Sequence, residues 1–498
     1  MIKCVQLSGN WSIGLLKMRQ FIITVIGLLL LSGCAANAPK GVTANGQIGA
    51  ADSIAALKSQ YQTLKQESFD KHTIYPTDIY PLIEALPENP RFKVSEVGKS
   101  FLAKPIYHIQ VGEGNRHVFM WSQMHGDEPT ATASVFDLIN YIDAPGNQQW
   151  FQSWKDELTL HIVPMVNPDG AEQESRFNAQ GIDINRDAKR LQTPEGRVLL
   201  KLADSIQPEF GFNLHDQNRF YTTGESDKPA TISVLAPAFN DEKDLNVARR
   251  NAMKLIGLLN DSIQKEHPGN VGRYDDTYSY RSFGDLFSGK GIATTLIESG
   301  GHHNDPNRQV ARWLTFMMLV QSIDAIAQKQ YVNETIAKYE AIPMNQSRGI
   351  VDVLVKNVSV GFDKESQDSL ENKQYLVDIS LNLGRKLDRA SIAEIGDISH
   401  GNAFNMFDMS GYQLLPIKGF EVSETLTLST EQYKQLLSQG FSYFIDNDEM
   451  LEIATDLPVV KTKQALPERP QLHKPASFLF SKEGKIAVAI INGQRVAL

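Results

Sequence analysis

Apolar and amphipathic segments alternate through the middle of this chain of 498 residues. Mostly apolar runs that end at polar or glycine-containing turns predict strands at residues 92–100, 105–112, 117–124, 158–167, 210–217 and 292–301. Segments with apolar residues at helical spacing predict helices at residues 129–142, 193–206 and 246–264. Because strands and helices alternate, we expect an α/β fold with a mixed, largely parallel sheet flanked by helices.

The pattern changes after about residue 340, where apolar and polar residues alternate one by one, as in residues 375–384. This alternation predicts half-buried strands, and residues 477–496 predict a hairpin with Glu483-Gly484 in its turn. One helix is expected at residues 429–440. We therefore expect an α/β domain over residues 71–340 and a smaller β-rich C-terminal domain over residues 341–498.

The N-terminus has the features of an export signal. An apolar run at residues 21–31 follows Arg19 and is too short to span a bilayer comfortably, which is typical of a signal-peptide core. It ends in Leu31-Ser32-Gly33-Cys34, which resembles the lipobox of bacterial lipoproteins. The resemblance implies a signal peptide over residues 1–34 and a lipid on Cys34; the alternative is an uncleaved membrane anchor.

The residue after the lipobox and the segment that follows it suggest where the protein resides. Ala35, rather than Asp, follows the cysteine, and this resembles an outer-membrane address. We expect a lipid-anchored protein of the bacterial cell envelope, facing the periplasm or the exterior. Residues 35–70 are expected to be a tether that contains one helix at residues 53–66.

Composition excludes several classes of partner and site. The chain has a net charge of −9 and no long basic run, so nucleic acid is not an expected partner. Its two cysteines, Cys4 and Cys34, exclude a disulfide framework and a cysteine-rich zinc site. A metal would have to be held by histidines and carboxylates. We expect a monomer.

Two histidines and a carboxylate form a candidate metal site. His125 and Glu128, which are separated by two residues, come after a predicted strand, and His215 follows another. Catalytic zinc sites use three protein ligands of these types and keep one position open. Each residue also has an ordinary interpretation, because an H-x-x-E pair occurs by chance and a lone histidine is often only hydrogen-bonded.

Charged residues downstream add candidates for substrate binding and catalysis. One polar segment contains Arg176, Asp183, Asn185 and Arg186. The guanidinium group of an arginine can bind a carboxylate or a developing oxyanion. Glu298 ends an apolar strand, where a carboxylate is costly unless it is paired or functional. The ordinary alternatives are a solvated charged loop and a buried salt bridge.

Taken in order, these residues resemble the zinc metallocarboxypeptidases over about residues 70–330. The motifs that carry the resemblance are His125-x-x-Glu128, Asn167-Pro168-Asp169-Gly170, Arg176-x-Asn178, Gly181-x-Asp183-x-Asn185-Arg186, His215 and Glu298. The ordered set is far more specific than any single member. The resemblance implies a zinc-peptidase-like fold, a peptide substrate and one Zn²⁺ per chain.

The resemblance also implies a role for each matching residue. His125, Glu128 and His215 match the zinc ligands, and Asp183 matches the carboxylate that orients the first histidine. Glu298 matches the general base, which takes a proton from the attacking water and delivers it to the leaving amine.

Three further residues are implied in substrate binding. Arg176 matches the residue that stabilises the oxyanion, and Asn185 with Arg186 matches the pair that binds the terminal carboxylate. A mobile tyrosine is expected some twenty residues before the base, and of Tyr274, Tyr278 and Tyr280 the spacing favours Tyr278.

This sequence departs from the family pattern beside the substrate-binding arginine. Asp187-Ala188 follows Arg186, where the family often has Asn followed by an aromatic residue. A second carboxylate there could weaken the hold of Arg186 on an acidic group. We make no prediction of the side chain preferred at the cleavage site, although Asp275, Asp276 and Asp285 precede the base.

The leading hypothesis is therefore a lipid-anchored zinc carboxypeptidase that acts on peptides, with cell-wall peptides as a variant. A second hypothesis is an N-acyl amino-acid deacylase of the succinylglutamate desuccinylase or aspartoacylase type, which shares several of these motifs. Arg176-x-Asn178 and the export signal favour the peptidase. A third hypothesis, a binding lipoprotein with an inactive site, would require the loss of a ligand or of the base.

Overall fold

The computed structural model describes residues 50–361 and 374–498. The predicted signal peptide, Cys34 and the lipidation site lie outside the described residues. Residues 53–498 form one compact unit. Within it, the apolar side chains of residues 353–496 make a core of their own, apart from those of the α/β domain.

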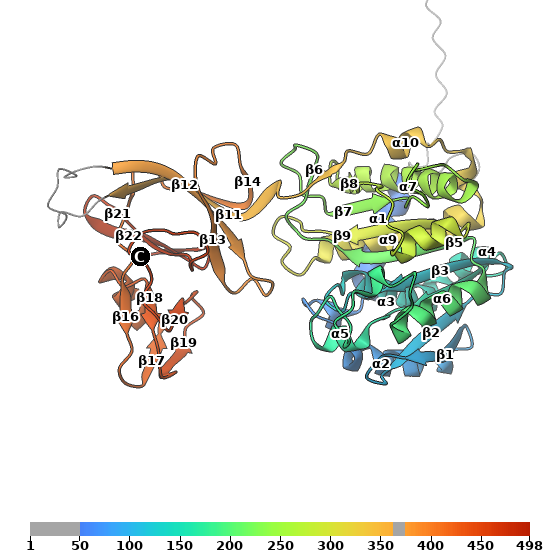
Figure 1. The fold of residues 1–498 in the computed structure, drawn as a ribbon, viewed down its shortest axis with the longest axis horizontal. Helices are drawn as coiled ribbons and strands as arrows, with labels where there is room; N and C mark the ends of the chain where they lie inside the picture. The colour runs from blue at the N-terminus through green and yellow to red at the C-terminus, as the bar shows by residue number, and fades with distance from the viewer. Residues whose placement is uncertain (1–49, 362–373) are drawn as a thin grey trace, which may run out of the picture. The chain divides into compact units, whose positions relative to one another are not determined.

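An eight-stranded sheet forms the centre of the α/β domain, in the order β1-β2-β4-β3-β5-β9-β7-β8 (Figure 1). Its strands are β1 Phe92–Lys99, β2 Pro105–Val111, β3 Arg116–Ser122, β4 Leu158–Val163, β5 Phe210–Asp216, β7 Ile232–Leu235, β8 Val271–Arg273 and β9 Ala293–Ser299. β4, β3, β5 and β9 run parallel to one another, and the pairs β1–β2, β2–β4 and β7–β9 are antiparallel. This confirms the predicted mixed sheet.

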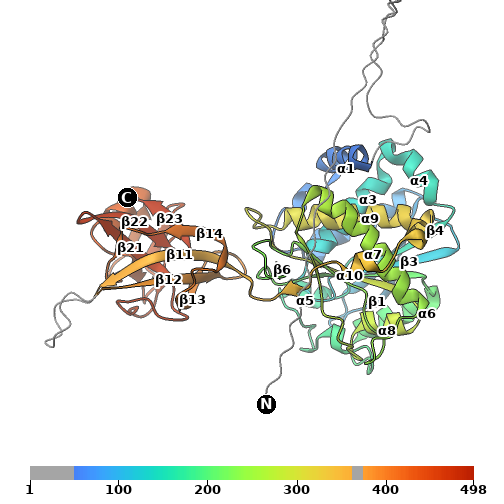
Figure 2. The ribbon, with the colours of Figure 1, turned by 90° about the horizontal axis from the view of Figure 1, so that it is seen from above.

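Helices cover both faces of the sheet (Figures 1 and 2). Val118 and Met120 of β3 pack into one core, and Phe119 and Trp121 pack into the other, because successive side chains of a strand point to opposite faces. The first core includes α3 Thr130–Asp143, α7 Val247–Glu266 and α9 Gln309–Ala327. The second includes α6 Pro194–Ile206 and α8 Phe283–Gly289.

The longest apolar helix belongs to the core. Of the described helices, α9 alone is long and apolar enough to cross a membrane, yet 78% of its most apolar window is buried inside the protein. Its length and composition are therefore explained by its position in the first core.

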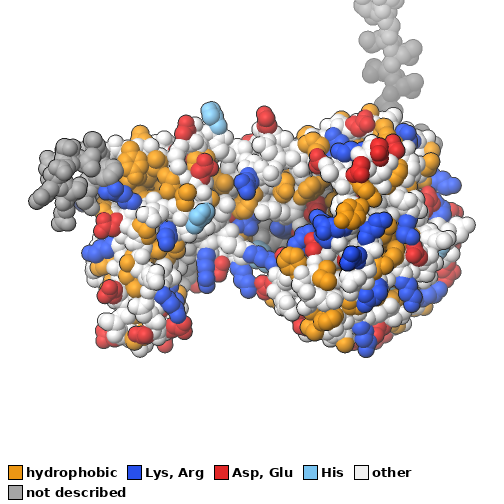
Figure 3. All heavy atoms as spheres, viewed as in Figure 1, with side chains coloured by type: hydrophobic (Ala, Val, Ile, Leu, Met, Phe, Trp, Pro, Cys, Tyr) orange, Lys and Arg blue, Asp and Glu red, His pale blue; other side chains and the backbone are white. Residues whose placement is uncertain are grey.

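Figure 3 shows acidic and basic side chains interspersed over the face in view, without an extended basic patch.

Part of the expected tether is a packed helix. α1, Ala50–Leu64, places Ile54, Leu57 and Tyr61 in the main core, and the Tyr61 ring lies 4.9 Å from that of Trp313. These three residues have the i, i+3, i+7 spacing of an amphipathic helix. The helix expected at residues 53–66 within the tether is observed as α1, and it packs against the core; residues 35–49 lie outside the described part of the chain.

The C-terminal residues form the predicted β-rich domain. Its main sheet has eight strands in the order β13-β12-β11-β15-β21-β22-β23, with β14 paired to β11. These strands are β11 Ile350–Gly361, β12 Gln374–Leu383, β13 Ala390–Gly396, β14 Asn402–Asp408, β15 Gln413–Leu414, β21 Ser477–Lys482, β22 Lys485–Ile491 and β23 Gln494–Ala497. The predicted helix is α11, Thr430–Ser438, and the predicted turn Glu483-Gly484 joins β21 to β22 with positive φ at both residues.

The pairing of the central strands sets the position of the site. The carboxyl ends of β3, β5 and β9 lie at one edge of the sheet because these strands are parallel. His125 follows β3, His215 is near the end of β5, and Glu298 is directly opposite His215 on β9. Ligands in α/β sheets bind at this edge, and the sheet brings these three residues together there.

A chain of histidines crosses the sheet away from this edge. His161 on β4 lies between His108 on β2 and His117 on β3, with a ring nitrogen 3.0 Å from one in each neighbour. Burial lowers the pKa of His108 to about 4, and burial with the two neighbouring imidazoles lowers the pKa of His161 to about 3. The folded state therefore keeps both rings neutral.

We expect acid to destabilise the fold through these histidines. Between pH 6.5 and about 4, His108 and His161 are protonated in the unfolded chain but neutral in the folded protein. The unfolded state therefore binds more protons, and the free energy of unfolding falls as the pH is lowered. The slope is on the order of 1.4 kcal/mol per pH unit for each histidine. Urea unfolding at several pH values measures it. His161→Gln should flatten the slope and His400→Gln, at an exposed residue, should not; equal slopes in wild type and His161→Gln would contradict the prediction.

Candidate metal centre

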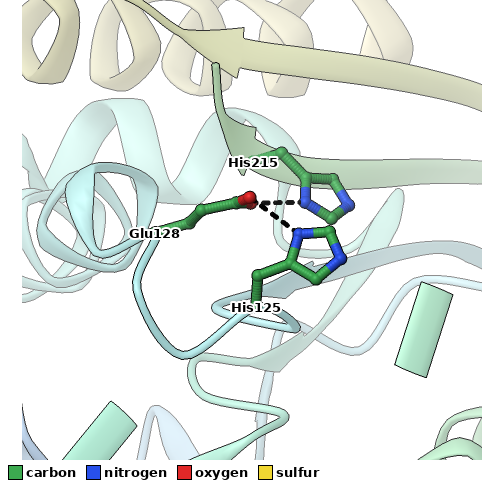
Figure 4. A group of neighbouring side chains, drawn as sticks. All are labelled: His125, Glu128 and His215. Atoms are coloured by element: carbon green, nitrogen blue, oxygen red, sulfur yellow. Dashed lines mark hydrogen bonds and ion pairs between the residues drawn. The ribbon is translucent and has the colours of Figure 1, made fainter. Parts of the chain in front are cut away.

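His125, Glu128 and His215 converge on one point below the protein surface (Figure 4). The Nδ1 atoms of His125 and His215 each lie 2.7 Å from an oxygen of Glu128. All three side chains are buried, and their candidate ligand atoms lie within 4.8 Å of one another. Two imidazoles and one carboxylate are a ligand set that zinc prefers in catalytic sites, so these residues fit the ion.

Protons and a metal ion would compete for this point. Burial alone would lower the pKa of His125, but Glu128 and Asp183 raise it to about 9. The pKa of Glu128 is low in spite of burial, because His125 and His215 stabilise its charge. Without an ion, the carboxylate thus attracts a proton onto His125. Ligands must lose such protons to bind metal, so we expect metal affinity to fall as the pH is lowered.

The loop that carries two of the candidate ligands is packed against backbone. Gly126 lies between them, and a Cβ on it would come within 1.9 Å of the backbone carbon of Gly170. Gly170 belongs to α5, Pro168–Glu172, whose first turn is capped by the side chain of Asn167. Only glycine fits at position 126, so the loop conformation depends on this contact.

Asp183 orients His125. Its Oδ1 lies 3.0 Å from Nε2 of His125, so the opposite ring nitrogen, Nδ1, faces Glu128. The other oxygen of Asp183 accepts a hydrogen bond from Nε of Arg176 at 3.0 Å. A carboxylate on the outer nitrogen fixes the ring and its tautomer, and the structure brings Asp183 to that place.

Arg176 lies beside the ligands. Its Nη1 is 3.2 Å from Oε1 of Glu128 and 3.1 Å from Nδ1 of His125. Its side chain is 39% exposed, so the guanidinium remains accessible at the edge of the cluster. A cationic donor in this place can stabilise negative charge that develops on a bound substrate.

Asn185 and Arg186 lie on the side of the cluster that faces α8. The Asn185 side-chain oxygen accepts a hydrogen bond from the backbone N–H of Phe283, the first residue of α8. Arg186 donates through Nη1 to the Asn185 carbonyl and to Oγ of Ser282. Arg186 is exposed, so the rest of its guanidinium can bind a solvent-borne carboxylate.

The unusual carboxylate beside Arg186 is turned into the protein. Asp187 is buried and accepts hydrogen bonds from the backbone N–H groups of Gln192 and Thr193 and from Oγ1 of Thr193. Through these hydrogen bonds, its carboxylate stabilises the loop before α6. The concern that it would weaken the hold of Arg186 on an acidic group is therefore not supported by its position.

Glu298 sits among the charged groups of the cluster. Burial raises its pKa well above the usual range, and the negative charge of Glu128 raises it further. Positive charge on His125 and Arg176 opposes these effects. A carboxylate with a raised pKa can accept and return a proton near neutral pH.

Tyr274 is the candidate tyrosine that has interactions near Glu298. Its backbone N–H continues the β7–β8 pairing, its ring lies 5.6 Å from that of Tyr221, and burial and then Glu298 raise its pKa. Tyr280 is 57% exposed. The assignment of Tyr278 remains a prediction. Tyr274 directly follows strand β8. This position in the sequence could have indicated Tyr274, but the prediction used only the spacing to Glu298.

The acidic residues before the base are engaged in the fold. Asp276 pairs with Lys243 and Arg249, and Asp275 accepts a hydrogen bond from the backbone of Thr277. Asp285 accepts one from the backbone of Ser279, and burial raises its pKa to about 6. These contacts do not identify a preferred substrate side chain.

Comparison with known proteins places these residues in a family context. The family model for zinc carboxypeptidases matches residues 79–227. Carboxypeptidase 2 of Trichophyton rubrum is 27% identical over 163 residues, which are 31% of this chain and 29% of that protein. Gamma-D-glutamyl-L-diamino acid endopeptidase 1 of Lysinibacillus sphaericus is 31% identical over 97 residues, 18% of this chain and 22% of that protein. The chain thus spans less than a third of the length of these relatives.

Among solved structures, a metallo-carboxypeptidase from Burkholderia cenocepacia aligns with a TM-score of 0.39 and 18% identity. The alignment covers 51% of this chain and 70% of that one. The carboxypeptidase A of Helicoverpa armigera aligns with a TM-score of 0.41 and 15% identity over 57% of this chain and 83% of that one.

The orientation of His125 by Asp183 gives a test of the metal site. Asp183→Asn removes the charge that holds the ring, and we expect Zn²⁺ affinity to fall about 10- to 100-fold. Competition with a chromophoric chelator at fixed pH measures the affinity. Asp204→Asn removes the same charge at an exposed residue that pairs with Lys290, and should bind zinc like the wild type. Unchanged affinity in Asp183→Asn would contradict the assigned arrangement.

Proposed function

We propose, from the match of residues 79–227 to the family model for zinc carboxypeptidases, that this chain is a zinc-dependent metallocarboxypeptidase that hydrolyses C-terminal peptide bonds. The observation that carries the proposal is the joint geometry of one sheet edge. Three candidate ligands converge there, and Arg176 and Glu298 lie beside them. No ligand, orienting carboxylate or base that the family pattern requires is missing.

The proposed mechanism assigns the proton transfers to Glu298. Zinc held by His125, Glu128 and His215 would polarise the scissile carbonyl and lower the pKa of the attacking water. Glu298 takes the proton of that water and delivers it to the leaving amine. Its burial next to Glu128 supports this role, because a raised pKa suits a group that must both accept and donate.

Two arginines on either side of the cluster would hold the substrate. Arg186, with the side-chain amide of Asn185, binds the terminal carboxylate through charge-assisted hydrogen bonds. Arg176 donates to the carbonyl oxygen of the scissile bond as negative charge develops on it. Its contact with Glu128, and its pairing with Asp183, hold it in place before the substrate arrives. Tyr278 remains the proposed mobile tyrosine, with Tyr274 as the alternative nearer the base.

Peptides of the cell wall are the second candidate substrate. The observation that favours them is the similarity to the Lysinibacillus enzyme, whose name specifies bonds between gamma-D-glutamyl and diamino acid residues. The deacylase alternative predicts release of an acyl group from a single amino acid. Product analysis after incubation with peptides, cell-wall peptides and N-acyl amino acids distinguishes the three.

The Glu298→Gln variant tests the proposed mechanism. It keeps the shape of the side chain but cannot accept a proton, so we expect kcat to fall by about 10²- to 10⁴-fold with zinc content unchanged. Release of C-terminal residues from a mixed peptide panel, with metal analysis of the same protein, measures both. Glu172→Gln, at a half-exposed residue paired with Lys104, is the matched control. Retained activity in Glu298→Gln would eliminate this base.

We also propose that the chain is lipidated on Cys34 and held at the outer membrane. The lipobox and the preceding apolar run support this proposal. In bacteria that express the gene, Cys34→Ser should move the protein from the membrane fraction to the soluble envelope fraction. Mass spectrometry of the wild type should find an N-terminal peptide that begins at a lipid-modified Cys34. A wild-type protein that retains residues 1–33 would contradict the processing site.

A further inference from the structure

A cavity lies beside the candidate metal site. It has a volume of about 200 Å³ and is lined by Asp127 and Asp216, which directly adjoin the candidate ligands Glu128 and His215 in the chain. Residues of the β-rich domain, among them Leu387 and Phe404, line it together with residues of the α/β domain. The β-rich domain therefore contributes surface next to the site of the proposed reaction.

Two ion pairs hold the β-rich domain to this side of the cluster. Arg385 donates to the backbone carbonyls of Asp127 and Glu174 and forms a 3.1 Å ion pair with the Asp127 side chain. Arg219, which follows β5, binds both oxygens of Asp352 on β11 at 2.6 Å. Arg385 thus ties the His125–Glu128 loop to the segment that carries Arg176. The wall formed by the β-rich domain is fixed by these contacts.

The carboxylates that line the cavity already have partners within the protein. Asp127 pairs with Arg385, Asp352 with Arg219, and Asp216 accepts hydrogen bonds from the backbone and side chain of Thr130. Asp305 accepts from the first N–H groups of α9. One oxygen each of Asp127 and Asp216 has no hydrogen-bond partner among the described residues and is covered from solvent.

The cavity does contain free hydrogen-bond donors. The Nη1 atom of the Arg308 guanidinium donates to the Ser299 carbonyl and lies 3.6 Å from an oxygen of Asp216, and its other nitrogens make no hydrogen bond to a described residue. Its side chain is 25% exposed. The ring of His72 has no hydrogen-bond partner among the described residues, and burial followed by the charges of Arg308, Arg219 and Arg385 lowers its pKa. Three guanidinium groups thus lie around His72.

The cavity is separate from the candidate site for the terminal carboxylate. Asn185, Arg186 and the segment that contacts them, residues 279–285, do not line it. A peptide whose C-terminal carboxylate lies at Arg186 and whose scissile bond lies at the metal must continue on the other side of the cluster. The cavity at Asp127 and Asp216 lies next to that path.

We propose that this cavity is a substrate subsite that binds a carboxylate-bearing side chain on the amino side of the scissile bond, with Arg308 as its specificity-determining residue and the β-rich domain as one wall. The proposal rests on the proposed peptidase function and adds a substrate class to it: peptides with an acidic residue shortly before the cleaved bond. Arg308 binds the carboxylate through its free nitrogens, and the apolar side chains of Leu387 and Phe404 contact the methylene groups.

Matched peptides test this subsite. The full mature chain, loaded with zinc, is assayed on blocked peptides that share a C-terminal residue and carry Glu or Gln at either of the two preceding positions. We expect kcat/KM to be roughly 10- to 100-fold higher for Glu at one position, as a charge-assisted hydrogen bond supplies. In Arg308→Gln the Glu-to-Gln ratio should fall to about one. Arg389→Gln, the same change at an 88% exposed residue of the β-rich domain, should keep the wild-type ratio.

Binding separates failure of the subsite from failure of the proposed function. The dissociation constants of the Glu and Gln peptides are measured for Glu298→Gln with and without Arg308→Gln. Cleavage without Glu preference, or a preference that survives Arg308→Gln, overturns the subsite and leaves the peptidase standing. Binding that prefers Glu and depends on Arg308, with no cleavage by the wild type, overturns the peptidase and supports the subsite. No cleavage and no preference overturn both.

Discussion

The buried carboxylate of Glu128 is the charge around which the site is organised. A buried carboxylate is stable only when it is paired and hydrogen-bonded. Here both imidazoles, Arg176 and the backbone N–H of Asp216 supply that compensation, from three separate segments of the chain. The parallel pairing of β3 and β5 brings two of these segments, the His125–Glu128 loop and the end of β5, to one edge of the sheet. A bound divalent cation would replace the proton that Glu128 now attracts, and so fits the same charge balance.

Much of this arrangement could be predicted from the order of residues. Apolar runs located β3, β5 and β9, and the parallel sheet that follows from alternating strands and helices places His125, His215 and Glu298 at one edge. The family resemblance then supplied the role of Asp183, and its contact with His125 agrees with that role. Such inferences succeed because strand ends and sequence spacing constrain where these side chains can be.

Other features depend on contacts that spacing does not encode. Asp187 was expected to compete with an acidic substrate group for Arg186. Its side chain instead accepts a hydrogen bond from Thr193, six residues away, and no sequence pattern indicated this partner. Residues 35–70 were expected to be a tether with one helix, yet Tyr61 of that helix packs on Trp313 of α9. Arg385 reaches the metal-site loop from the β-rich domain across more than 250 residues of chain. In each case a tertiary contact determines the local role.

If Cys34 is lipidated as proposed, the packing of α1 limits how far the enzyme can act from that anchor. Because the helix begins at Ala50, only residues 35–49 separate it from Cys34. A fully extended chain of that length reaches about 50 Å, whereas a tether that ran to residue 70 would reach more than twice as far. With Cys34 in the membrane, the catalytic domain would work within a thin layer above the bilayer. Its substrates would then be selected by their distance from the membrane as well as by their chemistry.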